Sequence, residues 1–325
     1  MSAMHVGLVG DVGGTNARFA LVDQDRKVRY PKTYPAKDFA SLDDAVCAYM
    51  KDTAGRKRPT RAAIAVAGPV VDGEIEFTNL DWQVSEAELV ANCVFEAVSL
   101  LNAVAALALD APRLDAESLH LIGSAEKGAA DGAIAVLGPG TGFGVAALAR
   151  TGGRDTPMPS EGGHASFAPF DEVEDQILHR LRGKHGGRVS IERVLSGPGL
   201  LNIYRTLGEI EGAPAEAADP GAVVAAADQG DAVARQALER FCAILGGVAG
   251  DLALTFGARG GVYVAGGIAP RLIERIEASD FRVRFEAKGR LADYVRDIPT
   301  YVITHPYTAL LGAARALAEL ERVTL

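Results

Sequence analysis

The sequence predicts an α/β protein with mixed sheets that is divided into two domains. Strand-like apolar segments alternate with helical segments along the chain, which is the pattern of an α/β fold. Two glycine-rich turns each separate a pair of strand-like segments. At 325 residues the chain is long for one hydrophobic core, and its most linker-like stretch lies at residues 111–115.

The first glycine-rich turn lies between apolar runs at His5–Val9 and Ala17–Val22. The glycines of Gly10-Asp-Val-Gly-Gly14 interrupt these runs, so the spacing predicts a strand, a tight turn and a second strand. No lysine follows the glycines, which excludes a P-loop. The continuation as a strand also excludes a GxGxxG turn that opens a helix.

A second segment repeats this layout. A strand-like run, four alternating glycines and another strand-like run occupy residues 133–149. Aligning Gly10 with Gly138 also superposes Gly14 on Gly142. This weak internal repeat suggests two related halves, each with a glycine-rich hairpin.

The other elements follow from apolar periodicity and helix-end signals. Ser85 is expected to cap a helix, because Glu88 stands three residues after it. A long apolar helix is expected to be central to the larger domain, and a strand leads through Ala265-Gly-Gly-Ile-Ala-Pro270 into another helix. The expected strands are Ala62–Ala67, Val98–Leu101 and the one from Gly261, and the expected helices are Ser85–Asn92, Ala103–Leu109, Asp171–Leu181, Ala232–Phe256, Arg271–Ala278 and Ala309–Arg322.

Composition excludes several classes of function. With 48% hydrophobic and 23% charged residues the chain reads as an ordinary globular protein, and its net charge of −9 argues against nucleic-acid or anionic-membrane partners. No apolar run is long enough to span a membrane, and we expect a cytoplasmic protein. Cys47, Cys93 and Cys242 are far apart in sequence, so neither a disulfide framework nor a zinc site is expected.

Both glycine-rich turns have the composition of phosphate-binding loops, because glycines let backbone N–H groups approach phosphate oxygens closely. In the first turn Asp11 can also hold hydrated Mg²⁺, and Thr15 offers a hydroxyl. Either turn alone could be an ordinary hairpin, but two in matching contexts suggest that both flanks of a triphosphate are held. The expected nucleotide-binding residues are Gly10, Asp11, Gly13, Gly14, Thr15, Asn16, Gly140, Thr141 and Gly142.

Four polar residues have the chemistry to bind the hydroxyls of a sugar. Glu161 and His164 flank two glycines, so both side chains can close on one small ligand. Glu192 supplies a second carboxylate, and Asn102 supplies an amide at the end of a strand, where ligands of α/β sheets usually bind. Taken singly, each of these residues could instead be a solvated or structural group.

Six segments, in order, resemble those of bacterial glucokinases. They are Asp11-Val-Gly-Gly-Thr-Asn-Ala-Arg18, Gly140-Thr-Gly-Phe-Gly144, Glu161-Gly-Gly-His164, Glu192-Arg-Val-Leu-Ser-Gly-Pro-Gly199, Ala265-Gly-Gly267 and Leu310-Leu-Gly312. The resemblance extends from the first strand to the C-terminus. The cysteine-rich zinc motif of the ROK kinases and repressors is missing, so the resemblance is to the zinc-free group.

This resemblance implies a two-domain actin-like ATPase (ribonuclease H-like) fold with an inter-domain cleft. A small domain at residues 1–113, completed by a C-terminal helix at 308–325, would precede a large domain at 114–307. ATP with Mg²⁺, bound to Asp11 through water, would phosphorylate the 6-hydroxyl of glucose, and a cytoplasmic homodimer is expected. The implied ligand contacts are Asn102, Glu161, His164 and Glu192 for glucose and Gly266 and Gly267 for the adenosine side.

One catalytic position departs from the family pattern. The asparagine that corresponds to Asn102 is normally followed by an aspartate, the general base for the sugar hydroxyl, but Ala103 stands here. Asp110 lies about two helical turns further and is a poor substitute. Losing a positioned base costs on the order of 10²–10⁴-fold in rate. The open alternatives are a glucokinase of reduced activity, a kinase for another sugar or small acceptor, and a non-catalytic glucose sensor or regulator.

Overall fold

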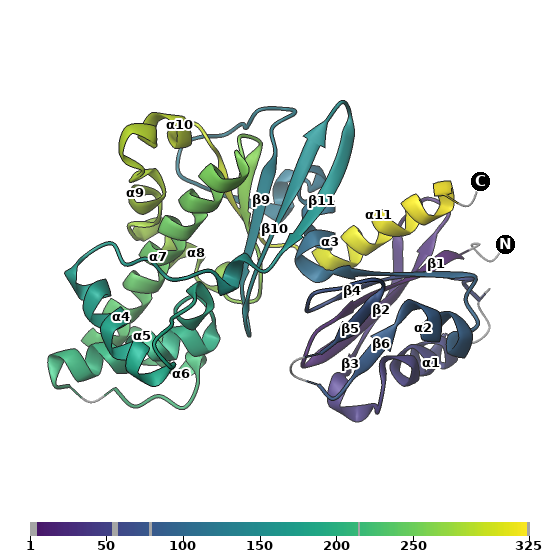
Figure 1. Ribbon diagram of the computed structural model, residues 1–325, viewed down its shortest axis with the longest axis horizontal. Coiled ribbons are helices and arrows are strands. Elements are labelled where there is room, and N and C mark those ends of the chain that lie inside the picture. Colours follow the sequence, from purple (N-terminus) through teal and green to yellow (C-terminus); the bar gives the residue numbers. More distant parts are fainter. Residues whose placement is uncertain (1–4, 54–57, 78–79, 214, 324–325) are drawn as a thin grey trace. The chain divides into compact units, whose positions relative to one another are not determined.

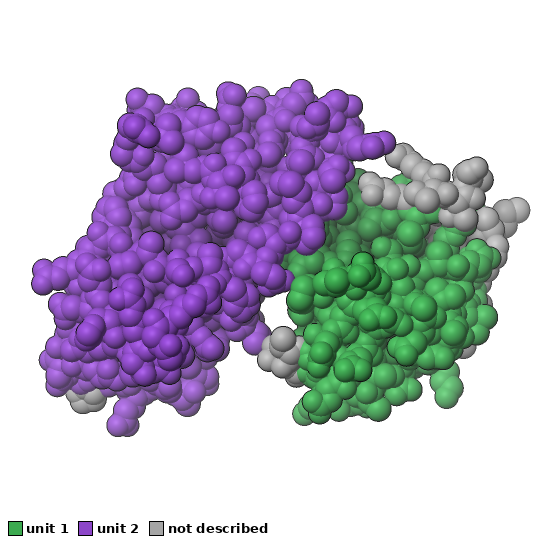
Figure 2. Space-filling view, viewed as in Figure 1, with its two compact units in different colours: residues 1–114, 305–325 green, residues 115–304 purple. Residues whose placement is uncertain are grey.

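The chain forms two compact units, which Figure 2 distinguishes by colour. Unit 1 comprises residues 1–114 and 305–325, and unit 2 comprises residues 115–304. The computed structural model describes residues 5–53, 58–77, 80–213 and 215–323. Among the helices of these residues, none combines the length and the apolar character needed to cross a membrane.

Unit 1 is built on a five-stranded sheet of order β3-β2-β1-β4-β7 (Figure 1). The first three strands form an antiparallel meander, and the last two run parallel to β1. Parallel strands buried on both faces read as continuous apolar runs, as the sequence of β4 does. The strands are β1 (His5–Val12), β2 (Asn16–Asp23), β3 (Val28–Pro35), β4 (Arg61–Val66) and β7 (Ala97–Asn102).

Helices cover both faces of this sheet. Leu8 and Ile64 pack with α1 and α2 on one face, whereas the adjacent residues Val9 and Ala63 pack with α11 on the other, as the two-residue period of a strand requires. A small hairpin, β5 (Glu74–Glu76) with β6 (Gln83–Ser85), precedes α2. The helices are α1 (Leu42–Asp52), α2 (Glu86–Cys93), α3 (Ala103–Asp110) and α11 (Thr308–Val323).

The C-terminal helix α11 packs directly against α3 within unit 1. Gly312 makes this close approach possible, because a Cβ atom there would lie 1.8 Å from the backbone oxygen of Ala106. Leu310 and Leu317 of the same helix are buried against the sheet. The segment Leu310-Leu-Gly312 therefore serves the packing of the unit.

Unit 2 repeats the sheet of unit 1 with one added strand, in the order β11-β10-β9-β12-β13-β8. The strands β11, β10 and β9 form an antiparallel meander, β12 and β13 run parallel to β9, and β8 adds antiparallel to β13. The weak repeat in the sequence thus corresponds to a repeated topology. The strands are β8 (Leu119–Ile122), β9 (Ile134–Pro139), β10 (Phe143–Thr151), β11 (Arg154–Ser160), β12 (Gly261–Val264) and β13 (Thr300–Ile303).

The core of unit 2 is organised by the long helix α7 (Figure 1). It contacts α5, α6, α8 and α9, and buries Phe241 and Leu245 completely. Residues 232–256 form this helix with the predicted bounds, from the cap Asp231 to Gly257 in the left-handed region. The helices are α4 (Glu172–Lys184), α5 (Gly197–Glu211), α6 (Pro220–Asp228), α7 (Ala232–Phe256), α8 (Ile273–Ala278), α9 (Phe281–Glu286) and α10 (Ala292–Arg296).

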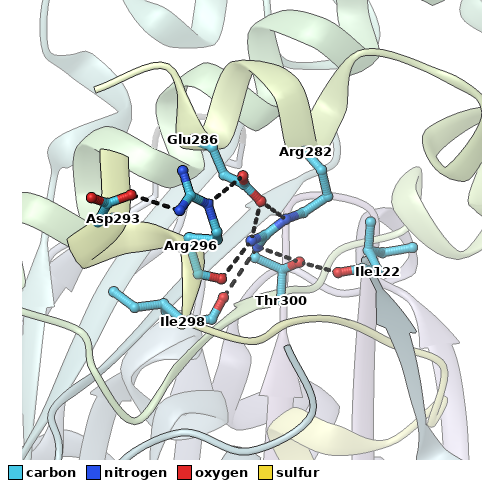
Figure 3. Close-up of polar contacts among 7 residues, drawn as sticks. All are labelled: Ile122, Arg282, Glu286, Asp293, Arg296, Ile298 and Thr300. Carbon is cyan, nitrogen blue, oxygen red and sulfur yellow. Dashed lines mark hydrogen bonds and ion pairs between the residues drawn. The ribbon is translucent and has the colours of Figure 1, made fainter. Parts of the chain in front are cut away.

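Polar contacts tie α9 to the sheet of unit 2 (Figure 3). The guanidinium of Arg282 donates to Glu286 at 2.7 Å and to the backbone oxygens of Arg296 and Ile298, both at 3.1 Å. It also reaches Thr300, whose hydroxyl donates to the backbone oxygen of Ile122 at 2.7 Å. The planar fork of an arginine suits such a junction, since it can serve several acceptors at once.

The local predictions of structure fare well where the signal is strong. Ser85 caps α2 by accepting from the N–H of Glu88 at 3.1 Å, as expected. At Glu192 only a 3₁₀ turn forms, over Ile191–Arg193. The following Gly197-Pro-Gly199 instead opens α5, because proline is well suited to the first turn of a helix.

Candidate active site

The first glycine-rich hairpin joins β1 to β2 in unit 1. Its tight turn is closed by the N–H of Gly13, which donates to the oxygen of Asn16 at 2.9 Å. Thr15 is exposed at the turn. A Cβ atom on Gly13 would have no heavy atom of the described residues within 4 Å, so the space above this backbone is open. An anion can approach the turn as closely as the glycines allow.

Asp11 lies at the end of β1 opposite Arg18 of β2. Their side chains form an ion pair of 3.0 Å between Arg18 Nη1 and Asp11 Oδ2. Burial raises the pKa of the Asp11 carboxyl above its ordinary value, while the charge of Arg18 opposes that rise. A cation bound beside Asp11 would act as Arg18 does and favour the ionised form of the Asp11 carboxyl.

The donors near Asp11 fit a magnesium ion that arrives with a nucleotide. Mg²⁺ is commonly held by one or two carboxylates together with substrate phosphates and water, and Asp11 is one carboxylate beside an open turn. Within the described parts of the chain, no group of three or more His, Cys, Asp or Glu side chains is arranged to hold a metal ion.

Asn102 has a structural role that the sequence did not reveal. It ends β7 and caps α3, where its side-chain oxygen accepts from the N–H groups of Val104 at 2.9 Å and Ala105 at 3.1 Å. Its amide nitrogen donates to the backbone oxygen of Gly68 at 3.1 Å. The side chain is therefore held in one orientation, with one amide hydrogen left for a further acceptor.

Ala103 is the first residue of α3 and is partly buried. It packs against the apolar cluster of α11 and the sheet, so its side chain offers no polar atom where an aspartate would. Asp110, at the other end of the helix, is only 4% exposed and accepts from Arg315 of α11 at 2.5 Å. That carboxylate ties two helices together and does not replace the missing base.

The second glycine-rich hairpin joins β9 to β10 in unit 2. The side chain of Glu192, which belongs to a separate 3₁₀ turn, contacts it. The carboxylate oxygen Oε2 of Glu192 accepts from the N–H of Phe143 at 2.9 Å. A Cβ atom on Gly142 would lie 2.5 Å from that oxygen, so a larger residue there would displace the Glu192 carboxylate. The hairpin is also tied to the start of α5, because the N–H of Gly197 donates to the oxygen of Gly140 at 2.8 Å.

Glu161 and His164 stand beside the same hairpin. Glu161 precedes a 3₁₀ turn that ends with His164, and His164 Nε2 lies 4.0 Å from Glu161 Oε2. Both side chains are about half exposed, at 57% and 52%. The turn packs closely on β10, since a Cβ atom on Gly163 would lie 1.9 Å from the oxygen of Phe143. The backbone of Phe143 thus contacts both groups: its N–H holds Glu192, and its oxygen supports the turn.

The segment Gly266–Gly267 follows β12, the strand next to β9. The N–H of Ala265 donates to Leu137 at 2.7 Å, and the N–H of Ile268 donates to Pro139 at 3.3 Å. Both glycines are exposed. These bonds hold the segment alongside the strand that leads into the second hairpin.

Unit 2 therefore gathers its predicted residues in one place, whereas unit 1 gathers Asp11 and Thr15 on one hairpin and Asn102 at the end of β7. Sequence reasoning assigned no role to Arg18 or to the backbone of Phe143. For Arg18, alternation across a two-stranded hairpin was an available signal, because it places residues 11 and 18 opposite each other. No sequence signal marks Phe143, whose role depends on its backbone.

Comparisons with known proteins identify the family of this chain. The family profile described as Glucokinase matches residues 8–320. The chain is 49% identical to a glucokinase of Caulobacter sp. (strain K31), over 98% of this chain and 96% of that one. It is 46% identical to a glucokinase of Hahella chejuensis, over 99% of each.

Solved structures give the same result. A glucokinase from an Antarctic psychrotroph superposes with a TM-score of 0.85 and 38% identity, over 96% of this chain and 98% of that one. A ROK family glucokinase from Streptomyces griseus, at 18% identity and a TM-score of 0.65 over 96% and 99%, shares the fold alone. The predicted two-domain actin-like kinase fold is confirmed, and the chain belongs to the glucokinase family.

Proposed function

We propose that this chain is an ATP-dependent glucokinase that transfers the γ-phosphoryl group of ATP to the 6-hydroxyl of glucose. In the reaction the sugar oxygen forms a bond to phosphorus, the bond from phosphorus to the ADP oxygen breaks, and the hydroxyl proton passes to solvent water. The observation that supports this proposal most is the grouping of Glu161, His164 and Glu192 beside a glycine hairpin. Two carboxylates and an imidazole are suitable partners for sugar hydroxyls.

Each part of the site has a separate task in this proposal. Unit 2 binds glucose through Glu161, His164 and Glu192, and its hairpin at Gly140–Gly142 and the segment Gly266–Gly267 contact the nucleotide. Unit 1 adds the amide of Asn102 and the phosphate contacts of the hairpin from Gly10 to Asn16, where Asp11 would hold hydrated Mg²⁺. Since phosphoryl transfer depends mainly on positioning and charge neutralisation, these groups can act without a covalent intermediate.

Removal of the proton from the sugar hydroxyl is the step that this chain supports least. Ala103 offers no acceptor, and Asp110 is paired with Arg315. We therefore expect turnover that is lower, by on the order of 10²–10⁴-fold, than that of the same chain with a carboxylate at position 103. Glucose binding does not need that carboxylate for its other contacts, so the same observation supports a second candidate, a glucose sensor without transfer.

A coupled assay for glucose 6-phosphate, run with MgATP on this chain and on Ala103→Asp, tests the proposal. Ala103→Asn is the matched control, because it adds similar volume without a basic carboxylate. We expect fast turnover for Ala103→Asp alone. Glucose binding, measured by calorimetry on all three proteins, reports separately on the acceptor site.

Three results would change the conclusion. Fast turnover by the unaltered chain would mean that another group accepts the proton. Glucose binding without turnover in either the unaltered chain or Ala103→Asp would favour the sensor. If neither protein binds or phosphorylates glucose while both remain folded, the acceptor is a different molecule, and mannose and glucosamine are the next sugars to test.

We further propose that the protein works in the cytoplasm, where ATP is available, and that it is a homodimer. The family resemblance suggests both. Light scattering combined with size-exclusion chromatography tests the dimer directly, because a monomer would elute with half the expected mass.

A further inference from the structure

Two cysteines that are far apart in sequence meet in unit 1. Cys47 lies within α1, Cys93 is the last residue of α2, and their Sγ atoms are 3.9 Å apart although 46 residues separate them. Cys47 is exposed, whereas Cys93 is 1% exposed. The third cysteine, Cys242, is fully buried in unit 2. The chain therefore carries one accessible thiol in contact with one protected thiol.

The surroundings of the pair already hold the two helices together. Asn92 donates to the carboxylate of Asp43 at 2.6 Å, and the Cys93 thiol lies 3.9 Å from the backbone oxygen of Asp43. Asp43 and Cys47 are four residues apart on α1 and so face α2 together. A disulfide needs an S–S distance of about 2.05 Å, so the sulfurs must approach by roughly 2 Å. Rotation about the Cα–Cβ bonds moves both sulfurs while the backbone stays in place, so we assign this approach to the two side chains.

The two thiols differ in reactivity in a way that sets their order of reaction. Burial, together with the neighbouring Cys47, raises the pKa of the Cys93 thiol to about 12. A thiolate, not a thiol, attacks a disulfide, so the exposed Cys47 reacts first and the protected Cys93 second.

We propose that Cys47 and Cys93 form a reversible disulfide site that is oxidised by low-molecular-weight disulfides. The Cys47 thiolate attacks one sulfur of the small disulfide and releases one small thiolate, which leaves a mixed disulfide on Cys47. Cys93 then loses its proton to solvent and attacks the Cys47 sulfur, and the second small thiolate leaves. Two protein thiols and one small disulfide thus become one protein disulfide and two small thiols.

The position of the pair separates this site from the ligand-binding residues of unit 1. Cys93 precedes the start of β7, whereas Asn102 ends the same strand. The cross-link would join α1 to α2, which cover one face of the sheet. It would leave the contacts within the β1–β2 hairpin and the capping of α3 by Asn102 unchanged. Disulfides in cytosolic proteins are usually transient and redox-sensing, which is the behaviour that a partly exposed pair permits.

The test uses the full chain and glutathione disulfide as the oxidant. Free thiols are counted with a chromogenic disulfide reagent under denaturing conditions, and intact mass shows whether glutathione is retained. We expect the oxidised chain to lose two thiols, retain no glutathione and recover both thiols with dithiothreitol. Peptide mapping without reduction should find Cys47 linked to Cys93.

Three variants make the result decisive. Cys93→Ser should stop at a glutathione adduct on Cys47, Cys47→Ser should react far more slowly, and Cys242→Ser should form the disulfide as the parent does. Glucose affinity should be the same before and after oxidation. A parent chain that keeps a stable glutathione adduct, keeps all three thiols, or forms only disulfide-linked dimers would overturn the proposal.

Discussion

The two glycine-rich hairpins have the same topology but obtain their charge differently. In unit 1 the carboxylate comes from the hairpin itself, because Asp11 belongs to β1 and is paired with Arg18 across the turn. In unit 2 residues 138–144 of the hairpin include no charged side chain, and Glu192 of a separate 3₁₀ turn accepts from the N–H of Phe143.

The different origin of the two carboxylates indicates how two hairpins of the same topology can bind different ligands. A carboxylate on the hairpin strand stays beside the phosphate-binding turn and can hold a cation there. A carboxylate that arrives from a loop has one oxygen fixed by a backbone N–H and its other oxygen available for a second ligand. We infer that the first hairpin serves the nucleotide, whereas the second links the nucleotide side to the sugar side.

The largest effect is expected from removing the charge that belongs to the first hairpin. Asp11→Asn, made in the Ala103→Asp background so that turnover is measurable, should lower kcat/KM for MgATP by about 10²–10³-fold. The physical reason is that the carboxylate that would hold the cation is lost. Unchanged glucose affinity is the control, and a variant with undiminished use of MgATP would contradict the role of Asp11.

The charge that the second hairpin receives should matter for the sugar instead. Glu192→Ala removes a charged acceptor and leaves the N–H of Phe143 without its side-chain partner, so glucose should bind roughly 10–100-fold more weakly. Glu192→Gln can keep the bond to Phe143 and should lose less. Calorimetry with glucose measures both, and equal losses in glucose and nucleotide affinity would show that the two hairpins do not divide the ligands as we infer.

A smaller effect should follow from crowding Glu192 without removing it. In Gly142→Ala the new Cβ atom would lie 2.5 Å from Glu192 Oε2 and force that side chain to move, so glucose affinity should fall by about 10-fold. Gly140→Ala is the matched control, because no heavy atom of the described residues lies within 4 Å of a Cβ atom there. Similar glucose affinities for the two variants would mean that the fit around Glu192 is not important.

The smallest effect concerns the ion pair at the other end of the first hairpin. The guanidinium of Arg29 and the N–H of Lys27 lower the pKa of the Asp23 carboxyl below its ordinary value of 3.8. A lowered folded-state pKa gives stability that is present above the unfolded value and is lost as the pH falls through the folded value. Asp23→Asn should therefore be less stable than the parent near neutral pH, and the gap should close in acid.

Urea unfolding from about pH 6 to about pH 2 measures this gap, and ligand binding should be unchanged at neutral pH. A gap that stays constant over the whole range would show that the ionised carboxylate of Asp23 contributes nothing specific to the fold.

Much of the fold could be predicted because its signals are local. The hairpin glycines and the cap at Ser85 each act over a few neighbouring positions, and the apolar pattern of residues 232–256 is continuous along the chain. The 3₁₀ turn at Ile191–Arg193 is harder to predict, since a 3₁₀ turn and a helix start with similar residues. The meeting of Cys47 with Cys93 left no local signal at all, because it depends on how α1 packs against α2.

By itself, the sequence determined the α/β class, the two glycine hairpins, the membership of the family and the missing carboxylate at position 103. These depend on residue type and on short spacings along the chain, which do not change with tertiary packing. Only the tertiary structure decided that Glu192 accepts from the N–H of Phe143, that the amide of Asn102 donates to Gly68, and that Asp110 is paired with Arg315. Each joins segments distant along the chain, and the packing of buried elements sets such distances.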